Sequence, residues 1–177
     1  MEINAKDLSK FCLRGVDLLI FVVLGTHELP FTRLLNEVER LKKEGIIQED
    51  VIVQRGHTRY ESDNLFLKQF VSHNEMDLLY EQARLIITHA GTGSIIMGLK
   101  KGKCVIACPR LAKYGEHNDD HQLQIVSALA GQGHMLSWQE GNQLEGVIRQ
   151  TEDFQPKPFH SGREQIYELI ENFIEDV

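Results

Sequence analysis

Short apolar runs alternate along the chain with segments in which apolar residues recur at helical spacing. Residues 18–24 contain no polar position, which is typical of a parallel strand buried on both faces. Gly25 ends this run, and Pro30 stands where the first-turn proline of a helix is expected. The apolar residues that follow at helical spacing, up to Gly45, are Phe31, Leu34, Leu35, Val38 and Leu41. The first predicted unit is therefore a strand, a loop and a helix.

The same alternation continues over the rest of the chain. Ser72 and Glu75 have the spacing of a capping box, in which each side chain bonds the other residue's backbone N–H at a helix start. Further strands are predicted at 51–53, 64–71, 85–88, 104–108 and 134–137, and further helices from 72, from about 94 to 102, at 122–130 and at 142–150. This order predicts an α/β fold with a doubly wound parallel sheet, which binds ligands at the carboxyl ends of its strands.

The length of 177 residues favours a single main domain. We expect that domain to cover residues 17–154, after an N-terminal extension at 1–16 that carries no clear signal. A proline-containing linker and an amphipathic C-terminal helix are expected at 155–177. That helix is a candidate contact for a partner, and covering the domain's own sheet is the alternative.

Composition and charge favour a folded globular domain and argue against some kinds of binding partner. Hydrophobic residues make up 42% and charged residues 25% of the chain, as in folded globular domains. The formal net charge of −7 argues against electrostatic binding of nucleic acid or of an anionic membrane surface. Three cysteines without a Cys-x-x-Cys spacing favour a reducing compartment. No transmembrane segment or signal peptide is predicted, so we expect a soluble cytoplasmic protein.

Two glycine-containing loops follow predicted strands and precede predicted helices. The first spans Gly25 to Glu28, and the second spans His89 to Ser94. Glycine lets a backbone approach a ligand closely, and a helix N-terminus favours a phosphate group. The alternative for both loops is an ordinary tight turn with a helix cap. The second loop matches neither Gly-x-Gly-x-x-Gly nor a P-loop, which disfavours a dinucleotide oxidoreductase and an NTPase.

The third loop, residues 109–122, is the densest in polar side chains. Its many donors and acceptors suit a polyhydroxylated ligand. A metal site is the rival interpretation, because His117 and His121 stand four residues apart with carboxylates between them. We expect no metal site, because further ligands at a typical zinc spacing are missing. A solvated helix start is the remaining alternative.

Together, the three loops resemble those of a known enzyme family. The motifs Phe21–Phe31, His89–Ser94 and Tyr114–Gln122 occur in the same order as in the C-terminal, donor-binding half of the family 28 glycosyltransferases, which have the GT-B fold. The chain is most similar to small bacterial glycosyltransferase subunits of capsular and exopolysaccharide biosynthesis. It is also similar to the soluble subunit of the dolichol-linked N-acetylglucosaminyltransferase. The resemblance implies a Rossmann-like domain that binds a nucleotide sugar.

The resemblance implies a UDP-sugar donor and gives each matching position a role. The donor-binding residues that it implies are Gly25, Thr26, Phe70, Val71, His89, Gly91, Thr92, Gly93, Ser94, Glu116, His117, Asp120, His121 and Gln122. Phe70 and Val71 would border the uracil. The residues that would contact the sugar are Glu116, His117, Asp120, His121 and Gln122. Met97 stands where many relatives have a ribose-binding glutamate, so the ribose contact must come from another residue.

The resemblance also implies a mechanism that needs two polypeptides, because GT-B enzymes use two facing domains and this chain has the length of one. A membrane-associated subunit equivalent to the N-terminal half would bind a lipid-linked saccharide acceptor and recruit the chain to the cytoplasmic face of the membrane. The reaction would transfer a hexose, galactose by preference, with no required metal or cofactor. His27 and His117 are candidate bases, although the partner half usually supplies the base. The alternative is a non-catalytic enhancer or scaffold subunit.

Overall fold

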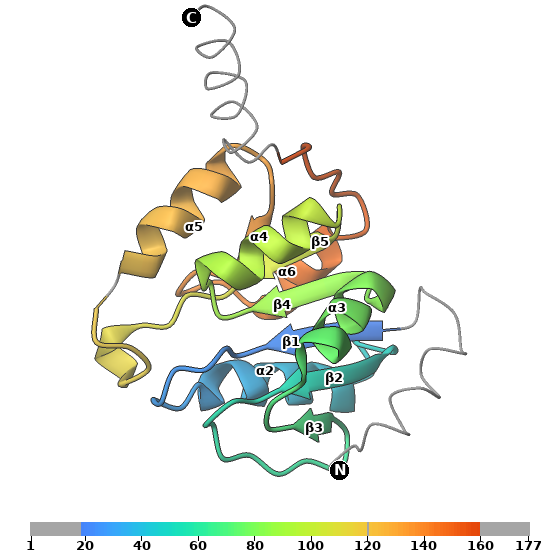
Figure 1. Ribbon diagram of the computed structural model, residues 1–177, viewed down its shortest axis with the longest axis vertical. Coiled ribbons are helices and arrows are strands. Elements are labelled where there is room, and N and C mark those ends of the chain that lie inside the picture. The colour runs from blue at the N-terminus through green and yellow to red at the C-terminus, as the bar shows by residue number, and fades with distance from the viewer. Residues whose placement is uncertain (1–18, 120, 160–177) are drawn as a thin grey trace, which may run out of the picture.

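The computed structural model describes residues 19–119 and 121–159, without the side chain of His121 (Figure 1). The predicted N-terminal extension and the part of the predicted C-terminal helix from residue 160 onward lie outside the described residues. The strands are β1 (Leu19–Val23), β2 (Asp50–Gln54), β3 (Phe66–Lys68), β4 (Leu85–Thr88), β5 (Cys104–Ala107) and β6 (Leu136–Ser137). The helices are α2 (Thr32–Lys43), α3 (His73–Gln82), α4 (Thr92–Lys100), the single 3₁₀ turn η1 (Ala112–Tyr114), α5 (His121–Gly131) and α6 (Leu144–Gln150).

The strands form one sheet in the order β3-β2-β1-β4-β5-β6, and all neighbouring strands are parallel. Strand order proceeds outward from β1 in one direction and from β4 in the other. The doubly wound parallel sheet that the alternation predicted is therefore confirmed.

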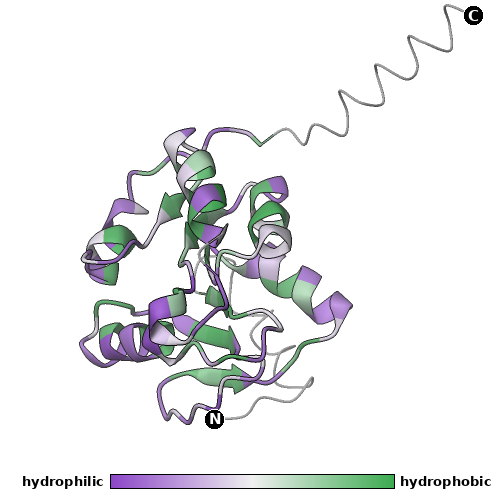
Figure 2. Cartoon of the chain, turned by 90° about the vertical axis from the view of Figure 1, so that its left-hand side faces the viewer, coloured by the Kyte–Doolittle hydropathy of each residue, from purple (hydrophilic) through white to green (hydrophobic). Residues whose placement is uncertain are grey.

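Both faces of the sheet are covered, because alternate residues of each strand point to opposite sides. On one face, Ile20 and Val22 of β1 pack in a buried cluster with residues of α2 and α6. On the other face, Phe21 packs with residues of α3, α4 and α5, and its ring meets the edge of the Tyr80 ring at 5.6 Å. Figure 2 shows the apolar strands lying among helices that carry both polar and apolar residues.

Helix α3 begins at the predicted capping box. The Ser72 hydroxyl accepts the backbone N–H of Glu75, and the Glu75 carboxylate accepts the backbone N–H of Ser72. The predicted role of Pro30 was wrong, because α2 begins at Thr32 with Phe31 as its N-cap and Pro30 lies outside the first turn.

Strand β3 is shorter than predicted. The backbone N–H groups of Asn64 and Leu65 both donate to the Ser62 hydroxyl at 3.0 Å. These two residues are held in a local turn before Phe66 joins the sheet. The predicted strand over 64–71 is therefore limited to three residues at the edge of the sheet.

Candidate functional site

The central strands β1 and β4 lie side by side at the point where strand order reverses. The helix after β1 packs on one face of the sheet and the helix after β4 packs on the other. Their loops therefore leave the same edge of the sheet in opposite directions, which is where parallel sheets bind ligands. We call this place the switch point, defined by the loops Gly25–Glu28 and His89–Ser94. It lies on the left of Figure 1 and faces the viewer in Figure 2.

The ring of His89 fills the space between the two glycine-containing loops. A Cβ atom on Gly25 would lie 2.5 Å from Cε1 and Nε2 of His89, and one on Gly91 would lie 2.8 Å from Cε1. Both glycines are therefore required by the imidazole ring itself. Sequence reasoning assigned the close approach at Gly25 to a pyrophosphate; in the structure this space belongs to His89, and the pyrophosphate contact stays a prediction.

His89 is held as a neutral imidazole. Its Nδ1 atom lies 3.1 Å from the carbonyl oxygen of Val23, and a neutral ring with its proton on Nδ1 donates to that oxygen. Burial, as the main cause, lowers the pKa of His89 to about 4, and the nearby charge of Arg110 lowers it further. At neutral pH, His89 is therefore an uncharged wedge: its ring separates the two glycine-containing loops, and its Nε2 atom carries no proton.

Helix α4 begins at the switch point without a side-chain cap. Gly91 is its N-cap residue and has no side chain to accept the N–H groups of the first turn. The first N–H groups of an α-helix, here those of Thr92, Gly93 and Ser94, have no partner within the helix. A Cβ atom on Gly93 would have no atom within 4 Å, so this turn faces open space. Backbone donors and the helix dipole are therefore available for an anion.

Ala90 gives the loop its direction. Its φ of 63° is the only positive φ of a non-glycine residue among the described residues. A left-handed conformation costs roughly 1–2 kcal/mol for a residue with a Cβ atom. This left-handed conformation turns the chain from β4 into α4 within a few residues. Backbone strain of this kind often accompanies a functional site.

Two buried side chains hold the loop after β1 by hydrogen bonds to its carbonyl groups. Arg110, which follows β5, donates to the carbonyl oxygens of Leu24 at 2.9 Å and Leu29 at 2.8 Å. The amide of Gln54, at the end of β2, donates to the carbonyl oxygen of Gly25 at 3.2 Å. Because its carbonyl groups are held in this way, the Gly25–Glu28 loop has a fixed shape, with Thr26 exposed.

His27 and His117 come together although they stand 90 positions apart in the sequence. Their ring centroids lie 4.6 Å apart, with an angle of 33° between the ring planes. His27 accepts the backbone N–H of Leu29 at Nδ1, which leaves Nε2 to carry the proton of its neutral form. The pKa of His27 is lowered, first by burial and then by the charges of His117 and Arg110. In this form Nδ1 is the nitrogen that takes up a proton, so His27 acts as a base only when its hydrogen bond from the Leu29 N–H is broken.

Glu116 forms a buried ion pair. Both of its carboxylate oxygens accept from Arg33, at 2.9 Å each, and one also accepts the backbone N–H of Leu111 at 3.0 Å. The Arg33 guanidinium in turn lies 4.6 Å from the centre of the Trp138 ring. The arrangement gives Glu116 a structural role, and its predicted sugar contact is untested.

The remaining predicted sugar-binding residues are only partly described. Gln122 accepts the backbone N–H of Arg110 through Oε1 at 3.1 Å, which leaves its NH₂ group for other partners. Asp120 and the side chain of His121 lie outside the described part of the chain. The structure therefore does not test the i, i+4 histidine pair as a metal site. Over the described ranges, no group of three or more His, Cys, Asp or Glu residues could hold a metal ion.

The predicted uracil-binding residues follow β3. The ring of Phe70 is 40% exposed and meets the ring of His57 edge-on, with 5.3 Å between their centroids. Val71 and Met97 are partly buried against the core on the face of α3 and α4. An exposed aromatic ring is suited to stacking on a planar base, and the prediction for Phe70 and Val71 stays open.

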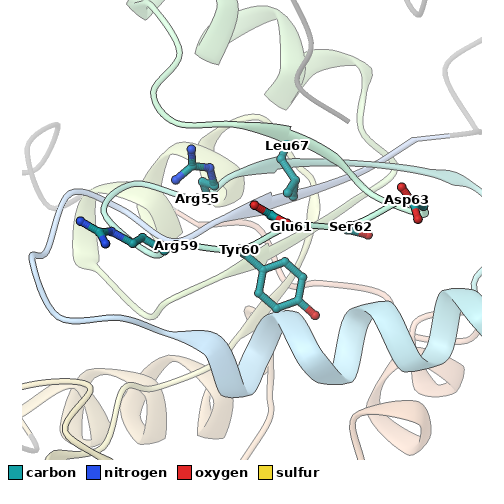
Figure 3. A pocket seen from close by; sticks show the side chains of 7 residues that line it. All are labelled: Arg55, Arg59, Tyr60, Glu61, Ser62, Asp63 and Leu67. Atoms are coloured by element: carbon teal, nitrogen blue, oxygen red, sulfur yellow. The ribbon is translucent and has the colours of Figure 1, made fainter.

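The connection between β2 and β3 borders a cavity of about 680 Å³. Figure 3 shows Tyr60 pointing towards α2, while Arg55 and Glu61 point to the other side of the loop. The Tyr60 hydroxyl donates to Glu39 of α2 at 2.6 Å, and the Ser62 hydroxyl donates to the same carboxylate at 3.0 Å. Glu39 therefore holds this loop against α2.

Comparisons with known proteins give the family. The model of the glycosyltransferase family 28 C-terminal domain matches residues 19–177. This chain belongs to that family. The described part of this family 28 domain contains no helix that is long and apolar enough to cross a membrane.

One curated protein is similar to this family 28 domain in sequence. It is the UDP-N-acetylglucosamine transferase subunit ALG13 of Eremothecium gossypii, which is 32% identical over 84 residues. The aligned region spans 46% of this chain but only 39% of that protein.

Solved structures agree on the fold. The glycosyltransferase of kitacinnamycin has a TM-score of 0.61 at 18% identity, over 78% of this chain and 35% of that one. A solution structure of ALG13 has a TM-score of 0.55 at 22% identity, over 87% of this chain and 94% of that one. Spinosyn forosaminyltransferase SpnP has a TM-score of 0.56 at 16% identity, over 96% of this chain and 47% of that one. The predicted Rossmann-like GT-B half is therefore confirmed as the fold of this family 28 domain.

Sequence reasoning missed the residues that hold the site together, namely Arg33, Gln54 and Arg110. Gln54 and Arg110 have a signal in the sequence that is recognisable only in retrospect, and Arg33 has none. Gln54 is the polar last residue of β2, and Arg110 follows β5 after two residues; at both places a side chain lies below the loops of the neighbouring strands. The pairing of Arg33 with Glu116 spans 83 positions, and no local pattern indicates it.

Proposed function

We propose that this family 28 domain binds a UDP-sugar at the switch point and transfers its hexosyl group, galactosyl as the first choice, to a lipid-linked saccharide acceptor. The observation that carries the proposal is the uncapped amino end of α4, which begins within the two loops of the switch point and faces open space at Gly93. Backbone N–H groups and the helix dipole suit the diphosphate of a nucleotide sugar.

In the proposed reaction, an acceptor hydroxyl attacks the anomeric carbon of the donor sugar. A new carbon–oxygen bond forms while the bond from that carbon to the diphosphate oxygen breaks, and UDP leaves with the electron pair. The proton of the hydroxyl passes to His27, to His117 or to a base on a partner. The N–H groups at the start of α4 stabilise the negative charge that develops on UDP, and no metal ion or cofactor is required.

A second subunit completes the proposed enzyme. The similar protein of E. gossypii is named a transferase subunit, and the described residues of this chain form one Rossmann-like half of a GT-B enzyme. We infer a membrane-associated partner that provides the other half, binds the acceptor and recruits this chain to the cytoplasmic face of the membrane. Capsular or exopolysaccharide biosynthesis is the process in which we place the pair.

Two experiments test the proposal. The first measures the thermal unfolding of the isolated chain with UDP and with a chelator present; a rise in Tm at millimolar UDP is expected, and no rise would contradict donor binding. The second purifies the chain together with its partner and supplies a lipid-linked acceptor with a panel of UDP-sugars. Transfer from one UDP-hexose supports the proposal, and hydrolysis or transfer from none contradicts it.

A non-catalytic enhancer subunit is the second candidate. It is favoured by one observation: Glu116 and the Gln122 oxygen, both predicted to contact the sugar, already bond Arg33 and Arg110. The variant Gly93→Asp discriminates the two candidates, because it places a negative charge where the diphosphate would lie. The partnered enzyme loses transfer in this variant if the chain binds the donor, and it keeps full transfer if the chain is only a scaffold.

A further inference from the structure

Arg110 is a buried cation whose guanidinium donates only to main-chain carbonyl groups among the described residues and lies 4.8 Å from the centre of the Phe31 ring. Its exposed fraction is 1%, and its guanidinium donates to the carbonyl oxygens of Leu24, Leu29 and Glu116 at 2.8–3.1 Å. No carboxylate bonds it among the described residues, and its Nε atom is buried without a hydrogen-bond partner. Burial lowers the pKa of Arg110 to about 10, so the group stays charged at neutral pH.

The charge of Arg110 has no hydrogen-bonded carboxylate to neutralise it among the described residues. The nearest carboxylate is that of Glu116, which raises the pKa of Arg110 but gives its hydrogen bonds to Arg33 and to the backbone N–H of Leu111. Of the two guanidinium groups, only that of Arg33 is hydrogen-bonded to the Glu116 carboxylate. Burying a cation that is not fully neutralised is costly, and a protein gains from it where its field acts on a ligand.

The positive charge of Arg110 acts on groups at the switch point. Its two hydrogen bonds to Leu24 and Leu29 hold both ends of the loop that carries Thr26 and His27. Its charge also contributes to the lowered pKa values of His27 and His89, one from each side of the switch point. Two independent groups at this edge of the sheet therefore feel the same buried charge.

We propose that Arg110 is a positioning residue for an anionic diphosphate group: it fixes the loop after β1 and holds a positive potential beneath the switch point. It acts through this loop and through space, without touching the ligand. The inference rests on the proposed function, in which the diphosphate is that of UDP.

The test compares two substitutions of Arg110 with a matched control. Arg110→Met removes the charge, and Arg110→Lys keeps a charge but replaces the guanidinium fork. Arg84→Gln is the control, because Arg84 pairs with Glu49 at the opposite, amino end of the strands and contacts nothing at the switch point. Dissociation constants for UDP and for inorganic pyrophosphate are measured by calorimetry with a chelator present.

We expect Arg110→Met to weaken both ligands about tenfold or more, which is the size of effect that removal of one buried charge produces. The control should bind as the wild type does. In addition, NMR titration should show a raised pKa for His27 in Arg110→Met, which a purely structural role would not produce. The other charged groups that face His27 are His117, Glu28 and Asp119. Binding within about twofold of the wild type, or an unchanged His27 pKa, would overturn the inference.

Arg110→Lys keeps the test decisive if Arg110→Met does not fold. Burial lowers the pKa of a lysine, so the variant should lose its affinity for UDP between about pH 6 and about pH 9, relative to the wild type. The same pH dependence in both proteins would overturn the inference.

The ligands separate this inference from the proposed function. A wild-type protein that binds pyrophosphate but not UDP would support the Arg110 site and contradict the UDP-sugar donor. One that binds UDP equally well with and without the charge of Arg110 would support the donor and overturn the inference. A wild-type protein that binds neither would contradict both.

Discussion

The imidazole ring of His89 occupies the space that a side chain at position 91 would need. A Cβ atom on Gly91 would lie 2.8 Å from Cε1 of His89, and the same ring excludes a Cβ atom on Gly25. One neutral ring therefore sets the separation of the two loops at the switch point.

Gly91→Ala should destabilise the protein and displace His89. Forcing a methyl group into a filled space costs about 1–3 kcal/mol. Gly93→Ala is the matched control two residues away, where a Cβ atom would have no atom within 4 Å. Its free energy of unfolding should stay within about 0.5 kcal/mol of the wild type or rise. Urea unfolding measures both variants, and equal stabilities would contradict the wedge role of His89.

Glu116→Gln should lower the free energy of unfolding by about 1–3 kcal/mol, because it breaks a charged pair in which only Arg33 retains solvent contact. A double-mutant cycle with Arg33→Met isolates the pair from other effects. We expect a coupling energy above about 0.5 kcal/mol. Additive effects of the two substitutions would show that the pair does not hold the third loop in place.

The fold was predictable from the sequence because buried parallel strands leave continuous apolar runs. Strand β1 was located to within one residue of its start and end, and the box of Ser72 and Glu75 marked the start of α3. The short length of β3 and the turn η1 were not predicted, because they depend on the Ser62 hydroxyl and on Gly115 in a left-handed conformation. Such single contacts leave no periodic pattern.

The site was predictable only in part. The glycine loops and His117 were singled out by their position after strands, and the structure brings His27, His89 and His117 to one edge of the sheet. The buried supports Arg110 and Gln54 were not found, because their partners are main-chain carbonyl groups of distant segments. Main-chain acceptors carry no sequence signature.

Acid should weaken the protein through Glu39. Burial alone would raise its pKa, but hydrogen bonds from Tyr60, Lys43, Asn64 and Ser62 outweigh it and lower the pKa from 4.5 to about 2. A lowered pKa in the folded state means that Glu39 stabilises the fold fully above about pH 4.5, and that this contribution is lost as the pH falls towards about 2.

Urea unfolding at several pH values checks this effect. The stability of the wild type should fall over that range, and the fall should be smaller in Glu39→Gln, which is also less stable at neutral pH. An identical dependence on pH in the two proteins would contradict the role of Glu39 in holding the loop that borders the cavity.

Binding of UDP to Gly93 variants tests the central claim most directly. Gly93→Asp places a carboxylate in the first turn of α4. There the negative charge stabilises the helix by about 0.3–1 kcal/mol through its interaction with the helix dipole, but it repels a diphosphate. Calorimetry with a chelator present should therefore show UDP binding to the wild type and to Gly93→Ala, and strongly weakened binding to a Gly93→Asp variant that is at least as stable as Gly93→Ala. Equal affinity of all three proteins for UDP, or no binding to the wild type, would contradict the assignment of the donor site to the start of α4.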